Sequence, residues 1–188
     1  MIELLPSTPF SLKDVMKLNI TRYAVSKMVE KGSVVKIGHG LYQKKLKKKR
    51  NTNFDTSMFE RVFARSSGEG CICLWSALEF YDLTDEFIEQ AWIYISYEKN
   101  IRVEEARPVR KRKLSLEHGV VDYEAFKITN LERTLIDCFL SKKHISLRDS
   151  LEMCRRAISL KKTSIKKLVE MAKVLNVYGQ TKEYLGLL

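Results

Sequence analysis

Residues 10–43 combine two short helical patterns, a tight turn and a strand pair, and this order constrains the fold more than any other feature of the 188-residue chain. Ser11 is expected to cap the first helix, with Asp14 three residues later as an acidic variant of the capping box. One apolar face then recurs at helical spacing. That face comprises Leu12, Val15 and Met16.

A three-residue turn, Leu18–Ile20, separates this helix from a second one. Its central Asn tolerates left-handed backbone angles, which suits a tight reversal. Thr21 is expected to cap a helix that extends to Lys31 and stops at Gly32. The predicted buried stripe of this helix comprises Ala24, Val25, Met28 and Val29.

A strand pair follows the second helix. Ser33–Ile37 has strand propensity, Gly38–Gly40 forms a hairpin tip, and Leu41–Gln43 returns as a second strand. Two helices joined by a three-residue turn and followed by a β-hairpin predict a winged helix-turn-helix. In such a unit the second helix enters the DNA major groove and the wing lies along the backbone or the minor groove.

The positive charge is concentrated at the same end of the chain. Residues 1–50 hold twelve Lys and Arg against three acids, a net charge of +9 out of the total of +11. The other 138 residues contribute only +2. Part of the excess is the run KKLKKKR, Lys44–Arg50, which is either a solubilising tether or a phosphate-contacting arm. Its position directly after the helix-turn-helix favours the arm.

The predicted DNA contacts are polar, small or basic side chains of the second helix, the wing and the Lys-rich exit. They are Thr21, Arg22, Tyr23, Ser26, Lys27, Lys31, Lys36, His39, Lys44, Lys45, Lys47 and Lys48. Two alternatives stay open at this point. The unit could instead contact a protein, and a histidine at a hairpin tip is most often a solvent-exposed turn residue.

Three motifs in this segment resemble the N-terminal winged helix of AbiEi-type antitoxins. They are Thr21-Arg22, Glu30-Lys31-Gly32 and Gly40-Leu41-Tyr42. Two later segments are also similar to that family, LWSALEFYDL at 74–83 and FKITNLERTLIDCFL at 126–140, the latter containing E-R-T-L-I-D. The chain departs from the family pattern where Tyr81-Asp82 replaces the usual His-Gly pair. It also has fewer residues than usual before the first helix.

The resemblance implies a type IV toxin–antitoxin, or abortive-infection, system. Antitoxins of this family repress their own operon by binding inverted repeats in its promoter through the winged helix. Their C-terminal domain neutralises a nucleotidyltransferase-like toxin, often without a stable complex. The implied partners of this chain are therefore double-stranded DNA of its own promoter and such a toxin.

The remaining residues indicate a mixed α/β domain with a helical C-terminal region, so the overall expectation is α+β, with domains at 1–50 and 51–188. An amphipathic helix is expected within 54–66, and a capping box at Ser76 and Glu79 opens another. Thr129 and Glu132 are expected to open the helix 131–140, on which Arg133 and Asp137 are i,i+4 partners, a pair that contributes a few tenths of a kcal/mol when it is exposed. Predicted strands cover 91–97, 102–103, 109–116, 119–123 and 126–129, and further helices 146–160, 164–177 and 184–188.

No catalytic, metal or cofactor signature is present in the sequence. Cys71 and Cys73 lack zinc-site spacing, and Cys138 and Cys154 occupy apolar helix faces, so buried structural thiols are expected. The three histidines are scattered and match no catalytic motif. We therefore expect no enzyme activity. The rival hypotheses are a winged-helix-targeted nuclease and a protein-interaction adaptor without DNA binding.

One basic cluster lies in the second domain and comprises Arg107, Arg110, Lys111, Arg112 and Lys113. Alternating side chains would place charge on both faces of a strand, so an exposed edge is expected. Such charges protect a sheet edge from pairing, or they form a second contact to DNA, RNA or an acidic toxin surface. Neither a long apolar run nor a secretory signal is found, so we expect a cytoplasmic protein with no membrane contact.

Overall fold

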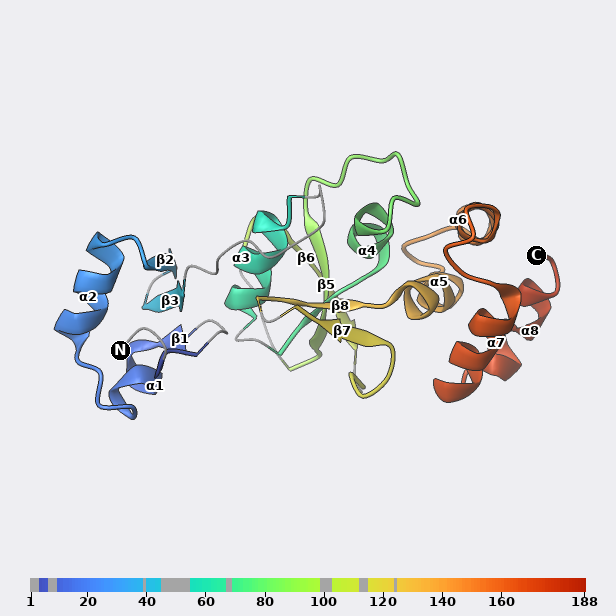
Figure 1. Cartoon of the computed structure of the whole chain (residues 1–188). Coiled ribbons are helices and arrows are strands. Elements are labelled where there is room, and N and C mark those ends of the chain that lie inside the picture. The colour runs from blue at the N-terminus through green and yellow to red at the C-terminus, as the bar shows by residue number, and fades with distance from the viewer. Residues whose placement is uncertain are drawn as a thin grey trace.

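The computed structural model (Figure 1) describes residues 4–6, 10–38, 40–44, 55–66, 69–98, 103–111, 115–123 and 125–188. The fold is mixed α and β, as predicted. Within the described residues, none of the helices has the length and apolar composition needed to cross a membrane. Several predicted residues lie outside the described ones. These are His39, Lys45, Lys47, Lys48, Arg112 and Lys113.

The N-terminal segment has the predicted order of elements. Helices α1 (Leu12–Met16) and α2 (Arg22–Glu30) precede a hairpin of β2 (Val34–Gly38) and β3 (Leu41–Lys44). A short strand that was not predicted, β1 (Phe10–Ser11), pairs antiparallel with β3 and completes a three-stranded sheet. Its own apolar cluster holds the segment together. The buried members are Leu5, Phe10, Val15, Ile20, Val25, Met28 and Val34.

The capping and turn residues of this segment largely have the predicted roles. Ser11 and Asp14 form the complete capping box of α1, and Asn19 has a left-handed φ of 59° in the turn. Gly32 ends α2 with φ of 66°. One assignment was wrong, because Met16 is 61% exposed and lies outside the core. α1 is only five residues long, so its apolar face has room for fewer contacts than the pattern suggested.

A five-stranded mixed sheet forms the centre of the remaining chain, in the order β6-β5-β4-β8-β7. β5 runs parallel to β6, and β4 runs parallel to β8, whereas the β4–β5 and β7–β8 pairs are antiparallel. The strands are β4 (Cys71–Ile72), β5 (Ala91–Ser96), β6 (Ala106–Lys111), β7 (Val120–Asp122) and β8 (Lys127–Thr129). β6 is thus an edge strand as expected, although it begins earlier than predicted.

Helices cover both faces of this sheet (Figure 1). Helix α3 (Ser57–Arg65) packs Phe59, Val62 and Phe63 on one face, together with Ile93 of β5. The opposite face is covered by α4 (Leu74–Phe80) and α5 (Leu131–Leu140). Alternation along β5 explains the two layers, since neighbouring residues of a strand point to opposite faces.

Three more helices pack around α5 at the C-terminal end. They are α6 (Leu147–Ser159), α7 (Ile165–Val174) and α8 (Tyr178–Leu185). The first two match the prediction closely, because Ser146 and Ser164 cap them as their sequences suggest. α8 begins six residues before the predicted start at Tyr184, and Thr181 within it is fully buried.

Two predicted capping boxes were wrong. α4 begins at Leu74, so Ser76 lies inside it, and its buried hydroxyl accepts a hydrogen bond from the Trp92 backbone at 2.9 Å. α5 is capped by Asn130, whereas the Thr129 hydroxyl is buried 2.7 Å from that of Thr134. In both places a buried hydroxyl found a partner in the tertiary structure rather than at a helix end.

Candidate nucleic-acid interface

Helix α2 is held by one face and exposes the other. Val25 and Met28 are buried in the N-terminal core, whereas Arg22 and Ser26 are exposed and Tyr23 is 72% exposed. The Thr21 hydroxyl caps the helix by accepting a hydrogen bond from the Ala24 backbone at 3.2 Å. α2 therefore presents a fixed row of side chains able to donate and accept hydrogen bonds.

Not every cation on α2 is available to a ligand. The Lys27 ammonium lies 2.8 Å from the Glu30 carboxylate and 5.8 Å from the centre of the Tyr23 ring. Glu30 is thus neutralised within the helix. Among the described residues, Arg22 and Lys31 have no ion-pair partner, so their charges face solvent undiminished.

The hairpin places further charge beside α2. Lys36 is exposed on β2, opposite Tyr42 of β3, and a bulge separates Lys36 from Gly38. Gly40 has φ of 69°, a left-handed conformation that few other residues adopt easily, and it forms the return of the hairpin. The described cations of α2 and of the hairpin therefore all lie within residues 22–44 of the chain.

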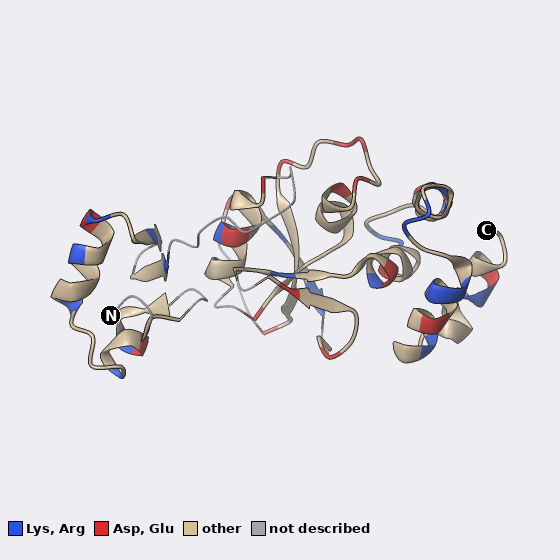
Figure 2. Cartoon of the chain, in the orientation of Figure 1, with Lys and Arg blue, Asp and Glu red and all other residues tan. Residues whose placement is uncertain are grey.

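Two exposed cations at α1, Lys13 and the C-cap Lys17, were not among the predicted DNA contacts. The signal was the charge count itself, since both contribute to the +9 of residues 1–50. The acid between them, Asp14, stays ionised and is bound within the capping box of α1. Hydrogen bonds from the Ser11 hydroxyl and backbone lower the pKa of Asp14. Figure 2 shows basic residues on both α1 and α2.

The hairpin also touches the central part of the molecule. The Arg65 guanidinium, at the end of α3, donates a hydrogen bond to the Ile37 carbonyl of β2 at 3.1 Å. The C-terminal end of α3 therefore supports β2, an edge strand of the N-terminal sheet. The residues of α2 take no part in this contact.

The described members of the basic cluster, Arg107, Arg110 and Lys111 on β6, do not form one patch. Arg107 lies with its guanidinium carbon 4.3 Å from the centre of a Trp92 ring, and the Lys111 ammonium is 4.8 Å from that of Tyr94. Arg110 is exposed on the opposite face of the strand. The two faces could not contact one flat ligand together.

The net charge of +2 beyond residue 50 is unevenly distributed between the central sheet region and the C-terminal helices. Residues 51–140 hold eleven Lys and Arg against sixteen acids, a net charge of −5. Residues 141–188, which form α6 to α8, hold eleven against four, a net charge of +7. The value of +2 for this part of the chain was a sum of two opposite regions (Figure 2).

All four cysteines are buried thiols, as predicted. Burial raises the pKa of Cys71 and of Cys154 to about 12. In the part of the chain that the structure describes, no three His, Cys, Asp or Glu side chains come together in a way that would hold a metal ion.

The comparisons with known proteins point to one family. Residues 1–43 match the family of transcriptional regulators described as AbiEi antitoxin. The N-terminal part of the chain is therefore similar to AbiEi-type regulators, which confirms the resemblance predicted from its motifs. The match ends at the hairpin and leaves residues 44–188 outside it. No curated protein matches the chain.

Proposed function

We propose that this chain is a DNA-binding transcriptional repressor of its own promoter and the antitoxin of a type IV toxin–antitoxin system. One observation carries the DNA-binding part. Helix α2 exposes Arg22, Tyr23 and Ser26 on a face that no described element covers, directly before a basic hairpin. The match of residues 1–43 to AbiEi antitoxin regulators supports the same assignment.

In this proposal α1, α2 and the β2–β3 hairpin act as a winged helix-turn-helix. Residues 1–50 form the DNA-binding domain and residues 51–188 the antitoxin domain. α2 enters the major groove, where Arg22 reads guanine through two hydrogen bonds. The Ser26 hydroxyl can donate or accept a hydrogen bond, so it can contact several bases. The wing and the Lys-rich exit at 44–50 lie along phosphates and set the register.

The position of Arg22 on α2 favours a role in ligand binding over a role in helix stability. Arg22 is the first residue of the helix, where the positive end of the helix dipole disfavours a cation. No acid among the described residues neutralises it. A phosphate or a guanine edge at this position would compensate the cost, because both present acceptors to the guanidinium.

We assign the basic cluster at 107–113 an auxiliary contact to the same DNA. Arg110, exposed on the face of β6 opposite Arg107, is the described member that we expect to reach a phosphate. Charges on an edge strand also prevent pairing with another sheet. The two roles are compatible, since both need the side chain in solvent.

The test is binding of the purified protein to a fragment of its own promoter, measured by fluorescence anisotropy over a range of salt concentrations. If about 5–8 phosphates are neutralised, log affinity should fall against log salt with a slope of about −5 to −7. A random fragment of equal length is the control. Affinity that does not change with salt, or equal affinity for both fragments, would contradict sequence-specific binding.

Two matched variants separate base reading from phosphate contact. Arg22→Ala should reduce the preference for the promoter by about 1–3 kcal/mol. Lys36→Ala should weaken binding to both fragments equally and lower the salt slope by about 1. The opposite pattern in the two variants would reject these roles. Binding of a protein partner with no DNA shift would favour the adaptor hypothesis.

The antitoxin part of the proposal has its own test. A nucleotidyltransferase-like reading frame beside this gene would be the expected toxin. Co-production of the full chain should restore growth of cells that produce that toxin. We propose no catalytic role for the chain, and a magnesium-dependent cleavage assay on DNA and RNA tests the nuclease alternative.

A further inference from the structure

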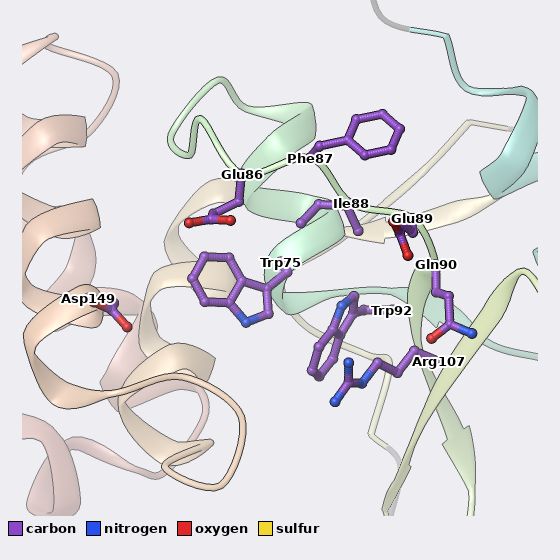
Figure 3. Close-up of a pocket in the computed structure, with 9 residues that line it drawn as sticks. All are labelled: Trp75, Glu86, Phe87, Ile88, Glu89, Gln90, Trp92, Arg107 and Asp149. Carbon is purple, nitrogen blue, oxygen red and sulfur yellow. The ribbon is translucent and has the colours of Figure 1, made fainter.

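A pocket of about 430 Å³ opens beside the connection between α4 and β5 (Figure 3). Both tryptophans of the chain line it. Trp92, Arg107 and Gln90 lie at one end, and Trp75, Glu86 and Asp149 at the other. The remaining lining residues are Phe87, Ile88 and Glu89.

The aromatic walls of this pocket are held in place. The Trp75 indole donates a hydrogen bond to the His144 carbonyl at 3.1 Å. The Trp92 ring meets the His144 ring edge to face, with centres 5.2 Å apart. The Gln90 amide donates to the Glu104 carbonyl at 2.7 Å and fixes the end of the connection against the turn that precedes β6. A ligand would therefore meet a preformed surface.

One wall already holds a cation. The Arg107 guanidinium carbon lies 4.3 Å from the centre of a Trp92 ring, within the range of a favourable cation–π contact. Trp75 is only partly buried and no cation is stacked on it in the described structure. The second indole thus offers the same kind of face to an incoming group.

Three carboxylates give the pocket a negative charge. Residues 81–90 hold four acids and no cation. Two of the four are paired, Asp82 with Lys162 at 3.5 Å and Asp85 with Arg156 at 2.8 Å. The other two, Glu86 and Glu89, line the pocket with Asp149 of α6, and none of these three has an ion pair among the described residues. Arg107 is the one cation among the residues that line the pocket.

This lining excludes some ligands and favours one. Its formal charge is −2, and eight of its nine lining residues belong to residues 51–140, whose net charge is −5, so phosphates of a nucleic acid would be repelled. Aromatic faces bordered by carboxylates are suited to a guanidinium or an ammonium group. Phe87 stands at the rim and is 83% exposed, which adds an apolar contact that a small ion would not need.

We propose that this pocket binds an Arg or Lys side chain presented by a partner protein. The cation lies against Trp75 between the carboxylates of Glu86 and Asp149, and Phe87 contacts an apolar side chain beside it. This proposal goes beyond the DNA-binding function, because it assigns the acidic middle of the chain to a protein contact. It does not depend on the winged helix.

Intrinsic tryptophan fluorescence tests the proposal directly, since both tryptophans lie in the pocket. The probe is the peptide acetyl-Gly-Arg-Phe-amide, titrated into the full chain at low salt. Its matched control carries citrulline, which has nearly the same shape as Arg but no charge. We expect saturable quenching by the Arg peptide, weakened by added salt, and at least about fivefold weaker binding of the citrulline peptide.

Variants locate the effect. Glu86→Gln combined with Asp149→Asn should weaken binding of the Arg peptide about fivefold or more, because both charges facing the cation are removed. Glu152→Gln is the matched control, being an exposed acid on α6 that does not line the pocket. Circular dichroism verifies that each variant is folded, and Trp75→Phe shows whether the quenched indole is Trp75.

Three results would overturn the proposal. Equal quenching by the citrulline peptide would show that charge plays no part. Unchanged binding in the doubly substituted variant would place the peptide elsewhere. Tighter binding of a single-stranded RNA oligonucleotide than of the peptide, unaffected by Glu86→Gln, would make the pocket a base-stacking site. In each case promoter binding by the same variants is measured separately, so that failure here is distinguishable from failure of the DNA-binding proposal.

Discussion

At the scale of single residues, Arg133 stands out because it is buried and has three partners. Its guanidinium donates to the carbonyls of Ser115, at 2.9 Å, and His118, and lies 3.4 Å from the Asp137 carboxylate. The structure has the predicted i,i+4 pair, and both of its side chains are only about one tenth exposed, so the pair is buried. The E-R-T-L-I-D segment is therefore explained by packing, and Glu132 within it accepts a hydrogen bond from Thr163.

We expect Arg133→Met to lower the free energy of unfolding by about 3–5 kcal/mol, since it leaves Asp137 buried without its cation. Burial already raises the pKa of Asp137, and the Arg133 charge opposes that rise. Chemical denaturation measures the loss. Arg148→Met, at an exposed arginine of α6, is the control and should change stability by less than about 0.5 kcal/mol. Equal effects of the two substitutions would contradict the role assigned to Arg133.

At the scale of elements, caps position the helices whose side chains are proposed to act. Thr21 holds the first turn of α2, from which Arg22 projects, and Ser146 holds the first turn of α6 through the Asp149 backbone at 3.1 Å. The two caps have similar geometry but lie on helices with different proposed roles. This makes them a natural pair for separating stability from DNA recognition.

Thr21→Ala and Ser146→Ala should each cost about 1 kcal/mol of stability, because each leaves a helical N–H without its acceptor. Only Thr21→Ala should also weaken promoter binding, because it frays the turn that positions Arg22 and removes the Thr21 hydroxyl, itself a predicted DNA contact. Thermal unfolding gives the stability and anisotropy gives the affinity. Promoter affinity lowered equally by both substitutions would show that general destabilisation, and not the α2 turn, is responsible.

At the scale of the whole molecule, the chain is divided into zones of charge and into separate apolar cores. The N-terminal cluster shares no member with the two clusters around the central sheet. The zones of +9, −5 and +7 follow the N-terminal segment, the sheet with its helices, and α6 to α8. Contacts with nucleic acid and with protein can thus be made by different parts of one chain.

The cysteines report on the integrity of the central core. Cys71, Cys73, Cys138 and Cys154 all belong to one apolar cluster, and burial raises the pKa of each. Because the thiolate is the reactive form, we expect a thiol-specific disulfide reagent at neutral pH to leave the native protein unmodified. All four thiols should react after unfolding in guanidinium. Rapid reaction of even one thiol in the native state would contradict this packing.

Much of the N-terminal segment was predictable because its signals are local. Ser11 with Asp14, Asn19 and Thr21 act on backbone groups within three residues of themselves. The same kind of local pattern gave wrong predictions at Ser76 and Thr129. Each hydroxyl was predicted to cap a helix but forms a hydrogen bond within the core. A cap pattern in sequence does not show whether a residue far along the chain offers a better partner.

By itself, the sequence determined the order of the two helices and the hairpin in residues 12–44, the buried stripe of α2 and the excess of positive charge at one end. These depend on periodicity, turn chemistry and composition, which operate over a few residues. Only the tertiary structure decided that Arg133 and Asp137 are buried together, and that Trp75, Glu86 and Asp149 line one pocket. These residues are brought together by the packing of α4, β5 and α6, and no local pattern encodes contacts across such separations in sequence.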